Sequence, residues 1–533
     1  MKTLFTHGHF FAPQSLNAQD DNVFAECLVV ENDKIVYVGA QENAPTADDT
    51  VDLQNRLVIP GFIDGHVHIM NFGQSLGRLS LLDCTCLEDI RKVIKSFAEA
   101  HPSAPRILCR GWMQSSTNGI ALASMLDDLD PRPIQIESFD LHSCWCNSAA
   151  LEEMGVYTAQ DPAGGTIHRD ENRRPSGLLS ENAMMEIVWP FLLKTATLED
   201  MMHALRLAFA AYTEAGYTGL VDMAMEDNMW AVLKPYYEQE NPPFHIAAHW
   251  LVPFSEDQEA NFTHVDRAIQ LWHEFNPATS PHFCITGIKL ICDGVVDGCT
   301  AALTQPYGNR QDPVEPIWPV DMLRAVVQRA DAAGLQCAIH AIGDKAVKQA
   351  IDVLGEVGTP GRRHRIEHLE LTAPEDAKRL GQLGITASVQ PVHSDPVILR
   401  AWPDLIGPER CQRAFAYKDF AEGGAKLAFG TDAPTAAHLP LPNLYNATTR
   451  RSAMEPESSQ TTNEHFGLGL AEAVTAATEG AAYARFAENW AGILKEGCRA
   501  DFVVLDMQWN AEDLLEGKVC ETWFAGKRVY ATK

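Results

Sequence analysis

Short β-type runs alternate with helix-like stretches along most of this 533-residue chain. The runs are residues 57–59, which lead into His66, and residues 218–222, 244–248, 285–291, 335–340, 365–368, 385–390 and 426–430. Between them, stretches such as residues 322–333 and 470–484 carry apolar side chains three or four positions apart, which is typical of a helix that covers a sheet. Eight strands that alternate with helices predict a (β/α)8 TIM barrel, in which functional groups sit at the carboxyl ends of the strands.

The two ends of the chain differ from this middle region. Residues 27–30 and 34–39 near the N-terminus, and residues 501–506 and 521–530 near the C-terminus, are also strand-like. Because chain ends often lie close together, we expect residues 1–56 plus 487–533 to form one composite β-sandwich domain. Residues 57–486 would form the barrel. The interval of about residues 71–200 is too long for one crossover between barrel strands, so we expect an inserted α+β domain there.

Composition and charge exclude several classes of partner. The formal net charge of −29 repels nucleic-acid backbones and anionic membranes. No run approaches the roughly 18 apolar residues that span a bilayer, and residues 1–9 lack the regions of an export signal. An odd total of 13 cysteines without such a signal predicts reduced thiols in a cytoplasmic protein. We therefore expect a small-molecule substrate, and neither a nucleic-acid nor a membrane partner.

Two imidazoles, His66 and His68, follow the first predicted barrel strand. Side chains two positions apart on a strand share one face, so both rings would point toward one place. Two neutral imidazoles suit a borderline divalent cation, with zinc the first choice and manganese, iron, cobalt or nickel as alternatives. Since the chain has 19 histidines, the pair alone also fits two surface or hydrogen-bonded histidines.

Four more polar residues lie in or just after later predicted strands. Lys289 lies in the fourth strand, His340 ends the fifth, His368 ends the sixth and Asp432 follows the eighth. Each alone has a structural interpretation: a salt-bridged lysine, core histidines, or a helix N-cap for Asp432. Together with the two imidazoles they make six polar residues at one end of a barrel. Because unpaired polar groups are rarely buried, the set as a whole favours a functional site.

With these residues the chain resembles the amidohydrolase superfamily, and within it the YtcJ-like group that includes N-substituted formamide deformylases. The matching segments are residues 57–64 with His66 and His68, Lys289 followed by Asp293 and Gly294, and residues 340–344, 365–368, 390–393 and 430–434. The resemblance covers nearly the whole chain.

The resemblance implies a metal centre. His66, His68 and Asp432 would hold one divalent ion, His340 and His368 a second, and Lys289 would bridge the two as its carboxylated form. We therefore expect one or two metal ions per chain, with zinc the first choice. A lysine ammonium has no lone pair, so Lys289 can be a ligand only as the neutral amine or as the carbamate. Burial and nearby metal charge lower a lysine pKa and so favour that chemistry.

The same resemblance implies hydrolysis of a carbon–nitrogen bond in an amide, an N-substituted formamide or a cyclic amide. Hydroxide activated by the metal would attack the carbonyl, and Asp432 would take the proton of the water and return it to the leaving amine. His393 is the alternative proton carrier.

Three further residues have two interpretations each. His142 and His393 could contact the scissile group or stabilise its oxyanion, or they could orient other residues. His142 resembles the group's Asp-Gly-His element, although Leu141 replaces the glycine. Trp112 could line a pocket wall, whereas core packing is the more common role of a tryptophan.

Two other functions stay open. A mononuclear aminohydrolase, or deaminase, would use one metal, and Lys289 argues against it because a single-metal site needs no bridging ligand. An inactive barrel that acts as a scaffold has no need for six convergent polar groups. The sequence identifies neither the substrate nor the oligomeric state. Homodimers are the most common soluble oligomers, so a homodimer is the first expectation.

Overall fold

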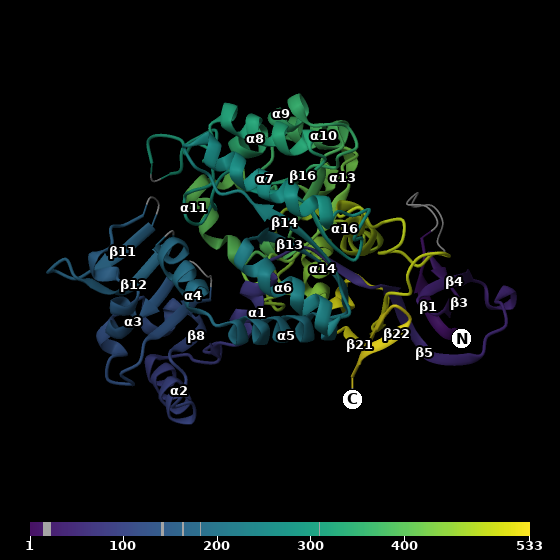
Figure 1. The fold of residues 1–533 in the computed structure, drawn as a ribbon, viewed down its shortest axis with the longest axis horizontal. Helices are drawn as coiled ribbons and strands as arrows, with labels where there is room; N and C mark the ends of the chain where they lie inside the picture. The colour runs from purple at the N-terminus through teal and green to yellow at the C-terminus, as the bar shows by residue number, and fades with distance from the viewer. Residues whose placement is uncertain (14–22, 140–142, 163–164, 182, 309, 533) are drawn as a thin grey trace. The chain divides into compact units, whose positions relative to one another are not determined.

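The computed structural model describes residues 1–13, 23–139, 143–162, 165–181, 183–308 and 310–532. The chain divides into two compact units, Met1–Ile69 with Phe209–Lys533, and Met70–Ala208. The first unit contains a barrel and a sheet built from both chain ends, and the second contains a separate sheet (Figure 1). Helices α1 (Ile69–Leu76) and α5 (Leu198–Glu214) carry the chain out of the first unit and back into it. Within the described residues, no helix has both the length and the apolar character of a membrane span.

Eight parallel strands of the first unit follow one another in space in the order of the chain. They are β6 (Phe62–Val67), β13 (Tyr217–Met225), β14 (His245–Leu251), β15 (Phe283–Ile291), β16 (Gln336–Ala341), β17 (Arg365–His368), β18 (Thr386–Val389) and β19 (Leu427–Phe429). Just after β19, the backbone N–H groups of Thr431 and Asp432 donate to the carbonyl oxygen of His66 at 3.2 and 2.7 Å, which brings the last strand back to the first. This arrangement confirms the predicted α/β barrel.

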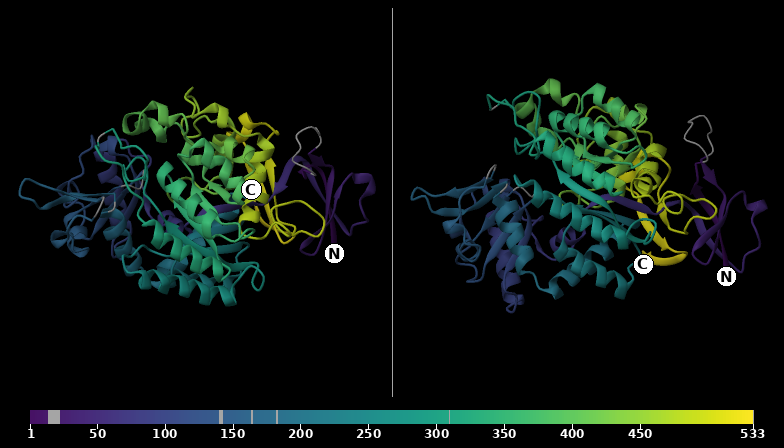
Figure 2. Two further views of the ribbon diagram at one scale, coloured as in Figure 1. Left: turned by 90° about the horizontal axis from the view of Figure 1, so that it is seen from above. Right: turned by 45° about the horizontal axis from the view of Figure 1, so that its top comes forward.

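Helices follow the barrel strands along the chain and lie around them (Figure 1 and Figure 2). They are α6 (Asp227–Glu240), α7 (Gln258–Glu274), α8 (Val320–Ala332), α9 (Asp344–Val357), α10 (Pro374–Leu383), α11 (Trp402–Ile406), α12 (Pro408–Cys411), α13 (Tyr417–Glu422), α14 (Pro440–Thr449), α15 (Leu470–Thr475) and α16 (Ala481–Ala484). The predicted helix over residues 322–333 is confirmed as α8, which buries Leu323, Val326, Val327 and Ala330 on one face. The predicted helix over residues 470–484 contains a π-helical turn at Ala476–Gly480, between α15 and α16.

Both chain ends contribute to a second sheet of the first unit. Its strands are β1 (Lys2–Phe11), β2 (Phe24–Ala25), β3 (Cys27–Glu31), β4 (Lys34–Gly39), β5 (Asp49–Pro60), β20 (Phe502–Asp506), β21 (Lys518–Phe524) and β22 (Lys527–Ala531). The N- and C-terminal parts meet where β5 pairs with β20 in antiparallel fashion. Phe5, Phe10, Val58, Phe502 and Val504 share one buried cluster beneath these strands. The hydrogen bonds join all eight strands into one sheet, and the sandwich form of this domain stays a prediction.

The first barrel strand begins later than the sequence predicts. Residues 57–59 belong to β5 of the terminal sheet, where Val58 pairs with Phe10 on one side and with Val504 on the other. The chain changes sheets at Gly61, whose N–H donates to the carbonyl oxygen of Asp501 at 3.0 Å. The apolar run continues through this change without a polar break, so the sequence alone gives no sign of it.

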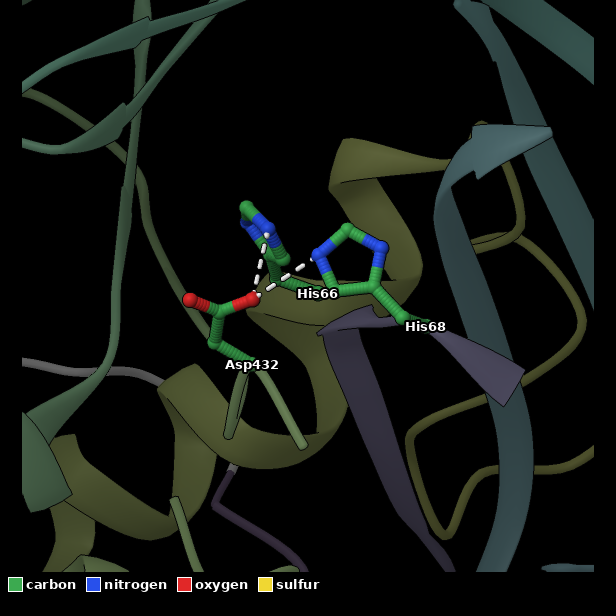
Figure 3. A group of neighbouring side chains, drawn as sticks. All are labelled: His66, His68 and Asp432. Atoms are coloured by element: carbon green, nitrogen blue, oxygen red, sulfur yellow. Dashed lines mark ion pairs between the residues drawn. The ribbon is translucent and has the colours of Figure 1, made fainter. Parts of the chain in front are cut away.

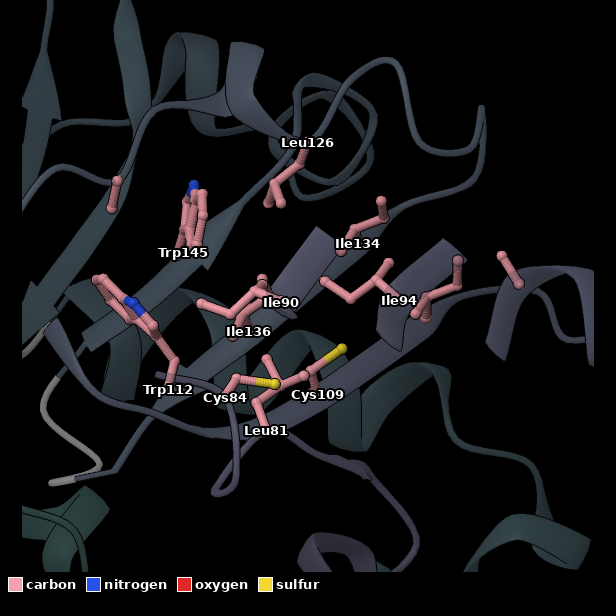
Figure 4. Close-up of a cluster of buried hydrophobic side chains, with 13 residues drawn as sticks. Leu81, Cys84, Ile90, Ile94, Cys109, Trp112, Leu126, Ile134, Ile136 and Trp145 are labelled. Carbon is pink, nitrogen blue, oxygen red and sulfur yellow. The ribbon is translucent and has the colours of Figure 1, made fainter. Parts of the chain in front are cut away.

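The second unit is built on a six-stranded mixed sheet in the order β11-β12-β10-β9-β8-β7. Its elements are β7 (Leu79–Ser80), α2 (Leu87–Ala100), β8 (Ile107–Trp112), β9 (Ile134–Ser138), β10 (Ser143–Cys146), α3 (Ser148–Glu153), β11 (Gly165–Arg169), β12 (Pro175–Glu181) and α4 (Trp189–Thr195). Trp112 lies in its hydrophobic core, with its ring centroid 5.3 Å from that of Trp145 (Figure 4). Trp112 is therefore a packing residue of this unit. All 13 cysteines lie within the described residues and are free thiols.

Candidate metal centre

The six predicted ligands come from the carboxyl ends of barrel strands in the first unit. His66 lies in β6 and His68 just after it, Lys289 lies in β15, His340 in β16, His368 ends β17, and Asp432 follows β19. His393 lies in the short 3-10 helix Pro391–Ser394 that follows β18. His142 falls outside the described residues. Parallel strands of a barrel end on the same face, which is why positions so far apart in the sequence meet.

His66, His68 and Asp432 form a group whose ligand atoms all lie within 4.8 Å of one another (Figure 3). The Oδ1 atom of Asp432 is 3.3 Å from Nε2 of His66 and 3.1 Å from Nε2 of His68. This oxygen is buried and has no hydrogen-bond partner of acceptable geometry in the structure. Two imidazole nitrogens and one carboxylate oxygen that converge in this way are a suitable donor set for zinc. The residues therefore fit a divalent metal.

Glu367 of β17 orients the imidazole ring of His66 through a hydrogen bond to Nδ1. Its Oε2 atom accepts a hydrogen bond from Nδ1 of His66 at 2.7 Å. Burial alone would raise the pKa of Glu367, but Arg365, whose Nε lies 2.5 Å from Oε1, and His66 hold that pKa well below its usual range. The ionised carboxylate keeps the proton on Nδ1, which leaves the lone pair of His66 Nε2 facing Asp432.

Asp64 of β6 joins the first barrel strand to the segment that follows the last one, β19. We call this junction, where the barrel closes, the barrel seam. One carboxylate oxygen of Asp64 accepts from the Thr431 hydroxyl at 2.6 Å, and the other accepts from the backbone N–H groups of Thr431 and His66 at 3.0 and 3.2 Å. Burial raises the pKa of Asp64 to about 6, against the effect of these hydrogen bonds. Asp432, next to Thr431, has a φ of 59°, which few non-glycine residues adopt. The contacts of Asp64 therefore help to hold Asp432 in place.

His368, Glu370 and His393 form a second group of potential ligands within 4.8 Å of one another. Nδ1 of His393 lies 3.5 Å from Oε1 of Glu370, and Nε2 of the same ring lies 3.9 Å from Oδ2 of Asp432. The second group therefore lies beside the first and meets it at Asp432. Burial would lower the pKa of His393, but the hydrogen bond to Glu370 and the charge of Asp432 raise it.

His340 belongs to neither group, although its ring centroid lies 4.4 Å from that of His368. Its Nε2 faces the carbonyl oxygen of Gly294 at 3.4 Å and Oδ1 of Asp293 at 3.5 Å. Burial, with the nearby charge of Lys289, lowers the pKa of His340 to about 3, so the ring is neutral at physiological pH. Such a ring has a lone pair to offer a metal.

Lys289 is buried, with only 2% of its surface exposed, and it is close enough to Glu367 and Asp432 to interact with their charges. Burial lowers its pKa to about 8, while the charges of Glu367 and Asp432 oppose that shift. An appreciable fraction of the amine is therefore neutral near pH 8, as carbamate formation requires.

The sequence did not predict Glu367 or Glu370 as site residues. A signal existed for Glu370, because it follows His368 at the same two-residue spacing that separates His66 from His68. For Glu367 the signal was weaker: Arg365 and Glu367 stand two positions apart in the strand and so place opposite charges on one face of it.

Comparison with known proteins identifies relatives along almost the whole chain. A sequence model described as "Amidohydrolase family" matches residues 49–530. The protein LONG AFTER FAR-RED 3 of Arabidopsis thaliana is 29% identical over 99% of this chain and 91% of its own. The putative amidohydrolase YtcJ of Bacillus subtilis is 28% identical over 90% of each chain. The N-substituted formamide deformylase of Arthrobacter pascens is 22% identical over 95% of each chain.

The fold also occurs among solved structures. An uncharacterised metal-dependent hydrolase from Pyrococcus horikoshii superposes with a TM-score of 0.78 and 22% identity, over 95% of this chain and 98% of its own. At this level of identity the match speaks for the fold alone. The sequence relatives confirm the predicted resemblance to the YtcJ-like group.

Proposed function

Because the chain belongs to the amidohydrolase family, we propose that it is a metal-dependent hydrolase that cleaves a carbon–nitrogen bond in a small amide, N-substituted formamide or cyclic amide. One observation carries this proposal: His66, His68 and Asp432 converge at the carboxyl end of the barrel with a buried carboxylate oxygen that lacks a hydrogen bond. The formamide substrates are suggested by the relative from Arthrobacter pascens.

In this proposal His66, His68 and Asp432 hold one divalent ion. A second ion would lie beside it, held by His368 with His340 or with the neighbours Glu370 and His393, and bridged by carboxylated Lys289. Nitrogen and oxygen donors of this kind favour zinc. A bound divalent ion supplies a Lewis acid that polarises a carbonyl and lowers the pKa of water.

Asp432 is the proposed proton acceptor. Burial would raise the pKa of Asp432, but His66 and His68 hold it well below its usual range, so the carboxylate is ionised at neutral pH. It can take a proton from the attacking water and return it to the departing amine. The Oδ2 atom lies 3.9 Å from Nε2 of His393, beyond hydrogen-bond distance, so His393 could carry the proton only through a bridging water.

Where His368 and His340 hold the second ion, His393 is free to stabilise charge on the substrate oxygen, and we propose that role for it. Glu370 and Asp432 raise the pKa of His393 against the effect of burial. The protonated form of His393 is therefore more populated near neutral pH than that of an ordinary histidine. A protonated imidazole can donate a hydrogen bond to the developing oxyanion. Glu370 would then keep the ring oriented through its contact with Nδ1.

The test is an assay of zinc-loaded protein on N-substituted formamides, N-acyl amines and cyclic amides, with detection of the released amine or ring-opened product. We expect turnover of at least one class. We also expect Asp432→Asn to lower kcat by about a thousandfold, while Asp404→Asn, at an exposed aspartate of α11, leaves kcat unchanged.

Two results would contradict the proposal. Release of ammonia from an amino-substituted ring, without cleavage of any amide, would indicate a deaminase. Absence of all turnover in protein loaded with zinc, manganese, iron, cobalt or nickel would favour the scaffold interpretation.

A further inference from the structure

The side-chain amide of Gln390 is buried and makes no hydrogen bond. The residue is only 2% exposed, and within the part of the chain that the structure describes neither its Nε2 nor its Oε1 has a hydrogen-bond partner. A carboxamide offers two N–H donors and a carbonyl acceptor, and burying all of them without partners costs free energy. The proposed reaction gives this amide no role, so its cost calls for another explanation.

The side chain of Gln390 is directed into the barrel. Strand β18 ends at Val389, but Gln390 keeps an extended backbone, with φ −117° and ψ 91°, so the alternation of side chains continues through it. Ser388, two positions earlier, therefore shares its face. The Ser388 hydroxyl donates to Glu367 and accepts from Arg365, both at 2.6 Å, inside the barrel. Gln390 faces the same interior, one layer nearer the carboxyl end of the strands.

Gln390 belongs to the layer of the barrel that contains His66. In the parallel ladder between β18 and β19, Val389 is opposite Phe429. One residue on, Gln390 comes opposite Gly430, whose N–H donates to the carbonyl oxygen of Val389 at 3.0 Å. A Cβ atom on Gly430 would lie only 2.5 Å from Cβ of His66. The amide without partners is therefore at the level of the proposed metal centre, where the proposed substrate would bind.

A carboxamide is matched best by a second amide whose N–H and C=O lie on the same edge. The N–H then donates to Oε1 of Gln390, and the C=O accepts from Nε2. A cyclic amide with a free ring N–H has this edge, because a small ring holds its amide bond in the cis form. An open-chain secondary amide is almost always trans, so its N–H and C=O point in opposite directions. Such an amide can meet only one of the two atoms of Gln390.

We propose that Gln390 selects the substrate, and that the substrate is a cyclic amide with an unsubstituted ring nitrogen. This inference rests on the proposed hydrolysis of a carbon–nitrogen bond, and it narrows the substrate classes named there to one. The ring N–H donates to Oε1 of Gln390, and the ring carbonyl accepts from Nε2. An alkyl group on the ring nitrogen removes the first hydrogen bond and leaves Oε1 unmet, so such a substrate is rejected.

Hydrolysis of this substrate opens the ring and consumes one water. The water oxygen forms a bond to the carbonyl carbon, the bond between that carbon and the ring nitrogen breaks, and the nitrogen takes up the proton. The amine and the carboxylate stay on one molecule, so the product is an amino acid. Because the carbonyl oxygen has two lone pairs, a hydrogen bond from Gln390 leaves one of them to the proposed centre.

The cost of the unmet amide gives a first test that does not depend on turnover. Methionine is close to glutamine in shape and needs no hydrogen bonds, so Gln390→Met removes the unmet groups without leaving a cavity. We expect this variant to raise the Tm of the zinc-loaded full-length protein by roughly 2 °C. A glutamine that served only the structure would instead lower the Tm when replaced. Gln382→Met, at an exposed position of α10, is the control and should leave the Tm unchanged.

The second test measures binding of two probes, δ-valerolactam and its N-methyl analogue. Zinc-loaded full-length protein that carries Asp432→Asn is used, so that the lactam is not consumed during calorimetry. We expect the lactam to bind at least about tenfold more tightly than the N-methyl analogue. Adding Gln390→Met should make the two Kd values equal, whereas adding Gln382→Met should keep the preference.

Three results would overturn the proposal: equal binding of the two probes with Gln390 in place, a preference that survives in Gln390→Met, or a Tm that falls in this variant. Turnover by the protein with Asp432 intact separates this inference from the proposed function. Hydrolysis of open-chain amides but not of δ-valerolactam would refute the cyclic substrate and leave the hydrolase in place. A lactam preference in binding without hydrolysis of any amide would support the role of Gln390 in recognition and refute the proposed hydrolase.

Discussion

Glu367 and His66, 301 residues apart in the sequence, are joined by a hydrogen bond of 2.7 Å inside the barrel. Both side chains are almost completely buried, with exposed fractions of 0% and 1%. Glu367 is also bound by the hydroxyl of Ser388 at 2.6 Å and by Arg365. The orientation of His66, and with it the group that includes Asp432, therefore depends on a carboxylate that is not itself a member of that group.

Replacing Glu367 with glutamine should weaken metal binding without removing a ligand. The amide carries no charge to keep the proton on Nδ1 of His66, and an outer partner of this kind is worth about 10- to 100-fold in metal affinity. Competition with a fluorescent zinc chelator measures the change. Glu375→Gln, at an exposed glutamate of α10, is the matched control and should bind zinc normally. Unchanged affinity in Glu367→Gln would show that the contact does not orient the ligand.

Gly430→Ala should disturb the same group through the backbone. A Cβ atom at residue 430 would lie 2.5 Å from the backbone nitrogen and from Cβ of His66, so one of the two strands must move. A displacement of about 1 Å at a catalytic group can cost about a hundredfold in rate, and we expect a loss of kcat of that order. Gly77→Ala is the control, because its nearest contact would be an ordinary 3.5 Å. Full activity in Gly430→Ala would mean that the barrel seam tolerates the shift.

The strands, and the positions of the candidate ligands at their carboxyl ends, could be predicted from the sequence because the signals are local. Each of β13 to β19 overlaps a β-type run predicted from the sequence, and a residue at the end of such a run lies at the functional end of a barrel. His66 and His68 needed only the alternation of side chains along a strand.

What the sequence could not predict depends on which distant segments become neighbours. The pairing of Glu367 with His66 crosses the barrel, and nothing near Glu367 in the chain indicates it. The change of sheet at Gly61 is decided by β20, which pairs with β5 from the far end of the chain. The hollow lined by Tyr237, His245, Phe524 and Lys527 likewise combines residues of α6 and β14 with residues of β21 and β22. These contacts are set by packing between elements, for which a single sequence carries no periodic signal.

Asp331→Asn should destabilise the barrel near its amino-terminal end, and the loss should depend on pH. Asp331 accepts hydrogen bonds from the Thr359 hydroxyl at 2.5 Å and from Nε2 of His364 at 3.0 Å. Burial would raise the pKa of Asp331, but the hydrogen bonds of Thr359 and the charge of His364 lower it. Its ionised form is thus favoured by folding, and we expect a loss of about 2 kcal/mol in the variant at pH 7.

The sign of the pH effect follows from that lowered pKa. The contribution of Asp331 is fully present above the unfolded-state pKa of about 3.9, and it is lost as the pH falls through the lower folded-state value. The difference between wild-type protein and variant in urea unfolding should therefore shrink below about pH 4. Asp321→Asn, at an exposed position of the same helix, should change stability little at either pH. A gap that widened at acid pH would contradict the assigned direction.

Reconstitution of metal-free protein with zinc should depend on bicarbonate, because Lys289 must lose its proton before it can react with carbon dioxide. Burial lowers its pKa to about 8, so a larger fraction of the amine is neutral at pH 8 than at pH 7. We expect one zinc per chain without bicarbonate, and a rise toward two with bicarbonate that is faster at pH 8 than at pH 7.

Lys289→Met should stay at one zinc under all conditions, and Lys378→Met, on the surface of α10, should behave as wild type. Carbon-13-labelled bicarbonate gives an independent readout, since a carbamate carbon is distinguishable by NMR from free bicarbonate. Two zinc ions in Lys289→Met, or a wild-type zinc content that ignores bicarbonate, would rule out a carbamate bridge and leave the second ion to the histidine and glutamate donors around His368.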